Sequence, residues 1–283
     1  PESELQMEEI AAKDILFVLD TSGSMAGEKM RQAQQSLTFC IENLGEGDRF
    51  NILAFSTDLH PFSEQPVAAT EENRKRALGF VDGLRPRGGT AIADALEFVR
   101  TQETAKGHVP LAVFLTDGLP TIGETDPAKI LVSSGEIDDR RVFPFGVGYD
   151  VDTKLLDGIA SKTGGSSTYV RPKESLELAL SNFYTKVAHP VVTNLKLDAG
   201  KAELYEMNPR DMPDLFKGTQ QIVTGRYGGD GKVRMELSGE IGGARERFAF
   251  EADLEPGFEN AFIPRMWAMG RIGYLQEQIR LNG

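Results

Sequence analysis

The first two-thirds of the chain contain short, continuous apolar runs. They lie at residues 15–19, 50–56, 111–116, 142–147 and 167–170. Runs of this length without alternation are typical of strands whose two faces are both covered. We therefore expect these five segments to form a buried, mainly parallel sheet.

Helical patterns separate the apolar runs. They span residues 28–44, 71–84, 90–102, 127–134, 153–161 and 175–187. Thr70 precedes two glutamates, and Asp126 precedes a proline, as expected of residues that cap helix N-termini. This alternation predicts an α/β domain over residues 13–187 with a doubly wound sheet. Residues 58–67 are too few for a crossover helix and predict a short antiparallel edge strand.

The pattern changes after residue 188. Alternating segments predict strands at residues 191–197, 202–205, 220–227, 232–237 and 245–252, with a glycine-rich turn at 228–231. We expect a smaller antiparallel β unit over residues 188–258, to which residues 1–12 could add a strand. Residues 259–283 predict a C-terminal helix with five apolar residues along one side: Met266, Met269, Ile272, Leu275 and Ile279. Trp267 and Arg271 share a face of this helix and are expected to dock it on the β unit.

Composition narrows the classes of function. The net charge of the 283-residue chain is −12, which disfavours nucleic-acid binding because phosphates require Lys and Arg. No apolar run reaches the ~18 residues that a membrane-spanning helix needs. The single cysteine, Cys40, excludes an internal disulfide and a cysteine-based zinc site, and its helical pattern predicts a buried thiol.

Oxygen-bearing side chains cluster where the predicted strands end. Asp20, Ser22 and Ser24 follow the first strand, Thr90 begins the third helix, and Asp117 follows the strand at 111–116. Ligands of open α/β sheets bind at such carboxyl ends, so the five side chains are expected to converge. A set without His or Cys suits a hard cation, Mg²⁺ or Mn²⁺ before Ca²⁺. Taken alone, the segment LDTSGSM favours an ordinary polar turn, with a metal site and a phosphate cradle as the competing interpretations.

Glycines and a cap complete the expected local structure of this site. Gly23 is expected to let the backbone turn where a Cβ would clash, and Gly88 and Gly89 to allow a close approach before Thr90. Thr90 is also expected to serve as the N-cap of its helix.

The three motifs D-T-S-G-S, G-G-T and L-T-D-G, in this order, resemble the metal-ion-dependent adhesion site of von Willebrand factor type A domains. Asp20, Ser22, Ser24, Thr90 and Asp117 match all five positions of the family's motif. The resemblance implies a Rossmann-like fold and metal-dependent protein binding without catalysis. It also implies that an Asp or Glu carboxylate of a partner protein completes the metal's coordination.

A narrower resemblance involves three longer segments, "LTDGLPTIGETDPAKI", "DLFKGTQQIVTGRY" and "IPRMWAMGRIGYLQEQIRL". They are similar to the inter-alpha-trypsin inhibitor heavy chains and their bacterial relatives. This resemblance implies a β domain of the same full-length protein, N-terminal to this chain, as a further partner. It also favours a secreted, periplasmic or cell-surface location.

The main alternative is an α/β enzyme that transfers a phosphoryl group, or binds phosphate, with the same loop. Neither a P-loop nor a G-x-G-x-x-G signature occurs, which disfavours this interpretation. A serine hydrolase would need a base, and the three histidines, His60, His108 and His189, are expected to lie in surface loops away from Ser22.

Overall fold

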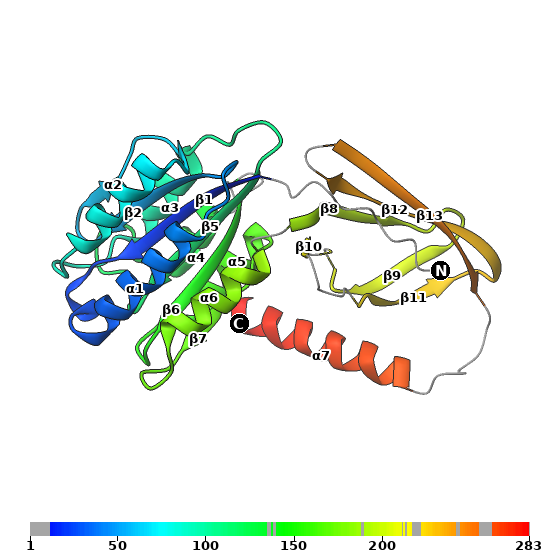
Figure 1. Cartoon of the computed structure of the whole chain (residues 1–283). Helices are drawn as coiled ribbons and strands as arrows, with labels where there is room; N and C mark the ends of the chain where they lie inside the picture. The colour runs from blue at the N-terminus through cyan, green and yellow to red at the C-terminus, as the bar shows by residue number, and fades with distance from the viewer. Residues whose placement is uncertain are drawn as a thin grey trace. The chain divides into compact units, whose positions relative to one another are not determined.

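The computed structural model describes residues 12–134, 137, 140–187, 190–210, 212, 214–216, 222–241, 244–254 and 262–282. Contacts divide the chain into two compact units, one of residues 12–188 and one that holds residues 189–283. Each unit has its own β structure and its own helix or helices (Figure 1). The strand predicted within residues 1–12 falls outside the described residues.

A seven-stranded sheet forms the centre of the first unit. Its strands are β1 (Lys13–Asp20), β2 (Arg49–Phe55), β3 (Leu59–Pro61), β4 (Val67–Ala68), β5 (Val109–Thr116), β6 (Arg141–Val147) and β7 (Thr168–Val170). The order is β3-β2-β1-β5-β6-β7, and β4 also pairs with β2. The pairings among β2, β1, β5, β6 and β7 are parallel, whereas β3 and β4 are antiparallel to β2. The predicted doubly wound, mainly parallel sheet is confirmed.

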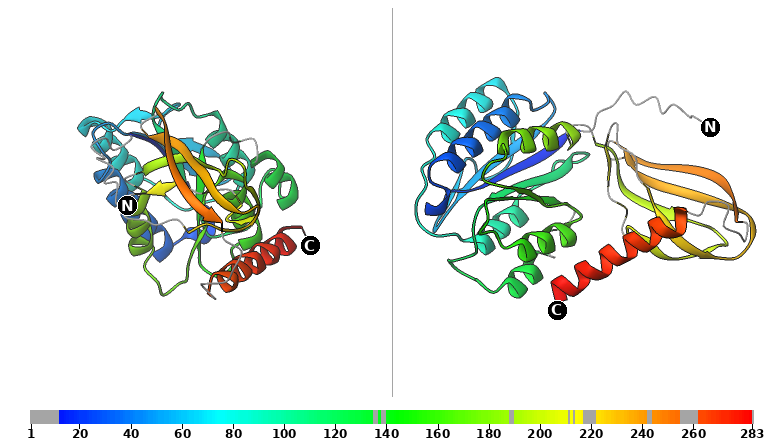
Figure 2. Two further views of the ribbon diagram at one scale, coloured as in Figure 1. Left: turned by 90° about the vertical axis from the view of Figure 1, so that its right-hand side faces the viewer. Right: turned by 90° about the horizontal axis from the view of Figure 1, so that it is seen from below.

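Helices cover both faces of this sheet (Figure 1 and Figure 2). They are α1 (Glu28–Glu42), α2 (Glu71–Asp82), α3 (Ile92–Thr101), α4 (Pro127–Ser134), α5 (Thr153–Thr163) and α6 (Leu176–Val187). Helix α1 packs against α2 and α6, while α4 packs against α3 and α5. Leu16 and Val18 of β1 enter the apolar core beneath α3, α4 and α5. Every residue of β1 is buried, as the continuous apolar run predicted.

Local capping explains where helices begin. The Thr70 side chain accepts a hydrogen bond from Asn73 N at 3.2 Å, and Asp126 Oδ1 accepts one from Ala128 N at 2.9 Å, so both predicted caps are confirmed. The prediction for Thr90 is wrong, because α3 begins at Ile92 and its N-cap residue is Ala91, without a side-chain cap. Thr90 therefore lies in the loop before the helix.

The described part of the second unit contains antiparallel strands, as predicted, arranged in two sheets. Its strands are β8 (Pro190–Asp198), β9 (Glu203–Asn208), β10 (Leu215–Phe216), β11 (Thr224–Gly228), β12 (Gly231–Ile241) and β13 (Ala244–Leu254). One sheet has the order β10-β8-β12-β13, and the other pairs β11 with β9. Gly229 and Gly231 have φ of 105° and 76°, so the predicted glycine-rich turn joins β11 to β12.

Helix α7 (Phe262–Asn282) docks on β9 and β11. Trp267 Nε1 donates a hydrogen bond to the Glu206 carbonyl at 2.9 Å, and Arg226 lies 5.8 Å from the centre of the Trp267 ring. Arg271 NH2 lies 3.9 Å from Glu206 Oε1. The predicted docking face is therefore confirmed. The predicted apolar row is largely exposed instead: Met269, Ile272, Leu275 and Ile279 are 65%, 54%, 44% and 70% accessible.

Close packing of α7 at Gly270 gives a test of this docking. A Cβ on Gly270 would collide with the Asn208 side chain of β9, whereas one on Gly273, in the same helix, would meet no atom within 4 Å. Alanine favours helix over glycine by ~1 kcal/mol. We expect Gly273→Ala to raise the free energy of unfolding of this unit by ~0.5–1 kcal/mol, and Gly270→Ala to lower it.

Trp267 is the only tryptophan of the chain, so its fluorescence during urea unfolding reports this unit directly. Gly273→Ala is the matched control, since both variants add one methyl group to the same helix. Equal stabilisation by the two substitutions would show that α7 does not pack on Asn208.

Candidate metal centre

The strand register places Asp20 beside the end of β5. Strands β1 and β5 are parallel neighbours, with Leu19 opposite Leu115, so Asp20 and Thr116 lie level at the carboxyl edge of the sheet. Both are fully buried. Thr116 Oγ1 donates a hydrogen bond to Asp20 Oδ2 at 2.6 Å. Thr116 thus orients Asp20, a contact that the sequence analysis missed although Thr116 precedes Asp117 directly.

Hydrogen bonds connect four of the five predicted site residues. Ser22 N donates to Asp20 Oδ1 at 2.8 Å, and the hydroxyls of Ser22 and Ser24 lie 3.0 Å apart. Ser24 Oγ donates to Asp117 Oδ1 at 2.7 Å. Asp20, Ser22 and Asp117 are buried, whereas Ser24 is exposed. The four side chains form a connected group of oxygen atoms with Ser24 on its solvent side.

Thr90 reaches the same place from the loop before α3. A Cβ on Gly118 would lie 3.7 Å from Thr90 Oγ1 and 3.8 Å from Ser24 Oγ, so both hydroxyls lie beside the Asp117–Gly118 turn. Thr121 fixes the backbone of Thr90, because Thr90 N donates to Thr121 Oγ1 and Thr121 N donates to the Thr90 carbonyl, each at 2.9 Å. Thr121 is a second positioning residue that the sequence analysis missed.

Two of the three glycines at this site are required by its geometry. Gly88 has φ of 71°, and a Cβ there would lie 2.5 Å from Thr57 Oγ1. A Cβ on Gly89 would lie 2.7 Å from Ile122 Cγ1. The prediction for Gly23 is wrong: its φ is not in the left-handed region, and a Cβ would make an ordinary contact of 3.6 Å with the Gly88 carbonyl. The turn after Asp20 instead continues as a short 3-10 helix at Gly23–Met25.

Three amide groups at the start of the first loop already donate hydrogen bonds within the protein. Thr21 N donates to the Phe55 carbonyl at 2.7 Å, and Gly23 N donates to the Gly88 carbonyl at 3.1 Å. Ser22 N is bonded to Asp20, as described above. A phosphate cradle needs such N–H groups turned toward the ligand. This loop presents oxygen atoms, which favours a cation over an anion.

Burial makes the Asp20 carboxylate costly to ionise. Desolvation raises the pKa of Asp20 above its usual range and outweighs the hydrogen bonds from Thr116 and Ser22, which lower it; the neighbouring Asp117 raises it further. A bound cation would offset this cost. The Asp117 carboxylate also forms an ion pair with Lys29 in the first turn of α1. The sequence places Lys29 near the first loop, but its spacing does not reveal this pairing.

The donor set fits a hard cation. Two carboxylates and three hydroxyls supply oxygen ligands only, which Mg²⁺ and Mn²⁺ accept. Within the described ranges, no group of three or more His, Cys, Asp or Glu side chains is arranged to hold a metal ion. Any metal at this position would therefore depend on the serine and threonine hydroxyls, and on neither sulfur nor imidazole.

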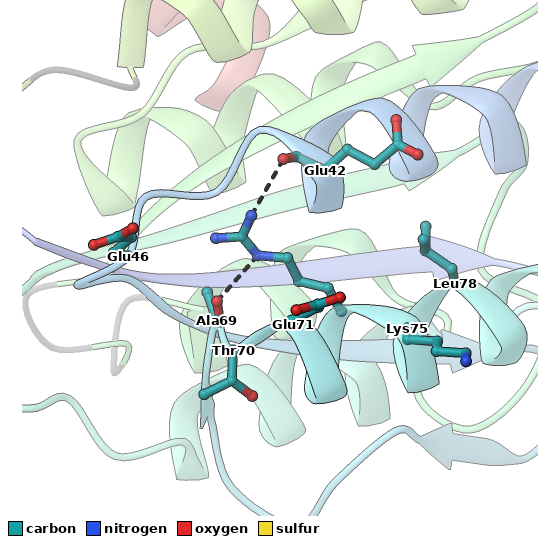
Figure 3. A pocket seen from close by; sticks show the side chains of 8 residues that line it. Glu42, Glu46, Ala69, Thr70, Glu71, Lys75 and Leu78 are labelled. Atoms are coloured by element: carbon teal, nitrogen blue, oxygen red, sulfur yellow. Dashed lines mark hydrogen bonds between the residues drawn. The ribbon is translucent and has the colours of Figure 1, made fainter.

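A separate groove of about 620 Å³ lies at the other edge of the sheet (Figure 3). It lies near the amino end of β2, and its walls include Glu42, Glu46 and Glu71 together with Arg74. Arg74 donates to the Ala69 carbonyl at 3.0 Å and to the Leu44 carbonyl at 2.8 Å, and so holds two chain segments together. None of the five predicted site residues lines it, so we assign it no part in the metal centre.

The prediction that the histidines lie in surface loops holds only in part. His60 belongs to β3, where its Nε2 lies 2.9 Å from Arg87 NH2, so its predicted loop position is wrong. His108 lies in a loop before β5, as predicted, but it is half-buried and bonds to Asp14. His189 lies outside the described residues. Cys40 is buried as predicted, and burial raises the pKa of its thiol.

Comparisons with known proteins agree with the resemblance described in the sequence. Residues 13–169 match the family model of the von Willebrand factor type A domain. The chain is 31% identical to inter-alpha-trypsin inhibitor heavy chain H4 of Homo sapiens, over 94% of this chain and 31% of that protein. The chain thus spans less than a third of the length of this relative.

Two solved structures illustrate the likeness in fold. A von Willebrand factor type A protein from Catenulispora acidiphila has a TM-score of 0.67 at 22% identity, over 86% of this chain and 66% of that chain. Proximal thread matrix protein 1 from the mussel byssus, solved with a zinc-occupied MIDAS motif, has a TM-score of 0.50 at 21% identity, over 64% of this chain and 46% of that chain. At such identities the likeness concerns the fold alone.

Proposed function

Because the chain belongs to the von Willebrand factor type A domain family, we propose that it is a metal-ion-dependent protein-binding module of the adhesion type. The proposed metal is Mg²⁺ or Mn²⁺, with Ca²⁺ less suited to so few carboxylates. Its proposed ligands are Asp20, Ser22, Ser24, Thr90 and Asp117. The observation that carries the proposal is the hydrogen bond from Ser24 to Asp117, which joins two loops 93 residues apart into one oxygen cluster.

Three of the five proposed ligands are neutral hydroxyls, and in the family that the chain resembles the aspartates act partly through water, so part of the charge of a bound divalent cation stays available to a further ligand. The bound cation supplies the positive charge that attracts an acidic group. The chain's own residues orient the site: Thr116 and Ser22 N hold Asp20 in place, and the exposed Ser24 marks the side open to solvent. The proposed occupant of the last coordination position is an Asp or Glu carboxylate of a partner protein, selected by the surrounding loops.

The comparisons support this proposal at the level of fold and motif. The matched family model covers the segments that carry all five residues. One protein of the same fold, proximal thread matrix protein 1, has been solved with zinc in its MIDAS motif. We carry over from it the idea of a divalent cation at this position, and not the identity of the metal.

From the relatives we also propose a partner domain and a cellular location for this protein. Heavy chain H4 of Homo sapiens is about three times as long as the segment matched here. Domains equivalent to its remaining parts are therefore candidates for contact with this chain. A preceding β domain of the same full-length protein is the partner that we propose first. The resemblance favours a secreted, periplasmic or cell-surface location. Among the described helices, none combines the length and the apolar composition needed to cross a bilayer.

Calorimetric titration with Mn²⁺ tests the metal site. We expect the wild-type protein to bind one equivalent of Mn²⁺ and Asp20→Ala to bind it at least ~100-fold more weakly. Loss of a residue that supports a metal ligand typically weakens binding 10- to 100-fold, and loss of the ligand itself should weaken it more. Asp230→Ala is the control, since Asp230 is an exposed carboxylate in the β11–β12 turn of the other unit. Equal affinities for the wild type and Asp20→Ala would sink the proposed site.

Binding of a partner needs a second experiment. The protein is used as bait with extracts of its native source, with Mn²⁺ or with EDTA, and Asp20→Ala serves as the negative control. Capture that requires both the metal and Asp20 supports an adhesion-type function. We expect no catalysis, so metal-dependent turnover of a phosphoester that is lost in Asp117→Ala would contradict the proposal in favour of a phosphoryl-transfer enzyme.

A further inference from the structure

Lys29 lies within the candidate metal centre. It is the second residue of α1, and its side chain is 33% exposed. Its ammonium group contacts Asp117 Oδ2 and donates to the Ser24 carbonyl at 3.3 Å. A Cβ on Gly148, after β6, would lie 3.5 Å from both Cε and Nζ of Lys29. The ammonium is therefore held between the ends of β1, β5 and β6.

The position of Lys29 is unfavourable for its own helix. A cation in the first turn of a helix is repelled by the positive end of the helix dipole. Its neighbour Glu28 is the residue type favoured there. The ion pair with the fully buried Asp117 carboxylate offsets this local penalty. The placement of Lys29 is thus explained by the site and not by the helix.

The two oxygen atoms of Asp117 are shared between two donors. Oδ1 accepts the hydrogen bond from Ser24, and Oδ2 contacts Lys29. A divalent cation at the proposed site would meet the same carboxylate, with the positively charged ammonium a few Å away. Because like charges repel strongly at such distances in a partly buried site, the cation and the ammonium cannot both lie close to Asp117 without cost.

We propose that Lys29 is an internal counter-ion that competes with the metal for Asp117, and so sets the affinity of the site. This inference rests on the proposed function. In the metal-free protein Lys29 neutralises Asp117. A bound cation would weaken the contact of the ammonium with Asp117, and the partly exposed side chain could then turn toward solvent. Lys29 is therefore a positioning residue that acts on the metal through Asp117.

The test compares Lys29→Met with two further variants. Lys29→Arg keeps the charge, and Lys106→Met removes one positive charge from an exposed loop before β5, at the opposite edge of the sheet. In calorimetry with Mn²⁺, we expect Lys29→Met to bind about tenfold more tightly than the wild type, as expected when one nearby positive charge is removed. Lys29→Arg and Lys106→Met are expected to stay within about twofold of the wild type.

A second measurement separates competition from a general change of charge. In EDTA, Lys29→Met is expected to melt about 2–4 °C below the wild type, because Asp117 loses its partner. Addition of Mn²⁺ is expected to remove this difference or reverse its sign. Lys106→Met is expected to show neither effect.

Two outcomes would overturn this inference and leave the proposed function standing, and a third would overturn both. If the wild type binds Mn²⁺ through Asp20 but Lys29→Met binds equally or more weakly, the site stands and the competition does not. If Lys106→Met gains as much affinity as Lys29→Met, the effect is one of net charge. If no variant binds Mn²⁺, both proposals fail. Binding by Lys29→Met alone would support competition and contradict metal loading of the wild type.

Discussion

Replacing Asp14 by alanine is expected to lower the free energy of unfolding of the first unit by about 3–5 kcal/mol, as is typical when one partner of a buried ion pair is removed. Asp14 is fully buried near the amino end of β1. Its Oδ1 lies 2.8 Å from His108 Nδ1, and its Oδ2 accepts from Ala105 N at 2.6 Å and lies 3.6 Å from Arg49 NH1. One carboxylate on β1 therefore contacts two other segments, the loop at residues 105–108 and the start of β2.

The loss is increased by a second buried cation. Arg140 donates to the Asp14 carbonyl at 3.2 Å and is 3% exposed. Burial lowers the pKa of Arg140 to about 10, and the negative charge of Asp14 opposes that fall. Without the Asp14 carboxylate, the Arg140 guanidinium still bears the desolvation cost of burial, and it loses part of the electrostatic attraction that offsets this cost.

Chemical denaturation followed by circular dichroism measures this effect, because Trp267 reports the other unit and the helices of the first unit dominate the signal. Asp82→Ala is the control, since Asp82 is exposed at the end of α2. It is expected to change stability by less than ~0.5 kcal/mol. A loss below ~1 kcal/mol in Asp14→Ala, well under the range for a broken buried pair, would show that this charged cluster contributes little.

Replacing Asp20 by asparagine is expected to abolish the metal response and yet leave the metal-free protein as stable as the wild type, or more stable. Asparagine keeps the shape of the side chain, and its Oδ1 can accept from Ser22 N. Thr116 Oγ1, which now donates to Asp20, can accept from the new amide because a hydroxyl serves in both ways. The substitution thus removes a buried charge and keeps a hydrogen bond to Ser22 and one to Thr116.

The pH dependence follows from the raised pKa of Asp20. An acid whose pKa is higher in the folded state costs stability above that pKa, and the cost disappears below the unfolded value of 3.8. In EDTA, the asparagine variant is therefore expected to melt a few degrees above the wild type at pH 7. The gap should narrow as the pH falls toward 4, because the wild-type carboxyl group then becomes neutral.

Differential scanning calorimetry from pH 4 to pH 7, in EDTA and in excess Mn²⁺, measures both effects. At 100 times the dissociation constant, Mn²⁺ should stabilise the wild type by about 2.7 kcal/mol and the variant not at all. An asparagine variant that melts well below the wild type in EDTA at pH 7 would show that the ionised Asp20 stabilises the fold, which is opposite to the expected sign.

The strands and the site motifs could be predicted from the sequence because both depend on local pattern. The run that ends at Asp20 is buried throughout, and the loops that carry Ser24 and Asp117 meet as the parallel order requires. Whether these oxygens bind a metal stays a prediction. The edge strand β3 and the caps at Thr70 and Asp126 likewise follow from short-range chemistry.

Other features depend on contacts that no local pattern records. Threonine is a residue type that often caps helices, but the hydrogen bond from Thr90 N to Thr121 holds Thr90 in the loop before α3. The sequence shows an apolar row on α7 but not its exposure, and it does not show that Gly270, beside the predicted docking residue Trp267, contacts β9. The pairing of Lys29 with Asp117 joins residues 88 positions apart, so spacing along α1 could not reveal it.

The hydrogen bond between Ser24 and Asp117 shows at which stage of folding the metal site can form. The two residues are 93 positions apart, and the segment between them includes β2, α2 and α3, so β5 must join β1 before the crevice exists. A nascent chain that has not yet formed β5 has no site for a cation. A cation that binds only the finished fold slows unfolding and leaves the rate of folding unchanged. Metal at this position would therefore lengthen the lifetime of the native protein without guiding its assembly.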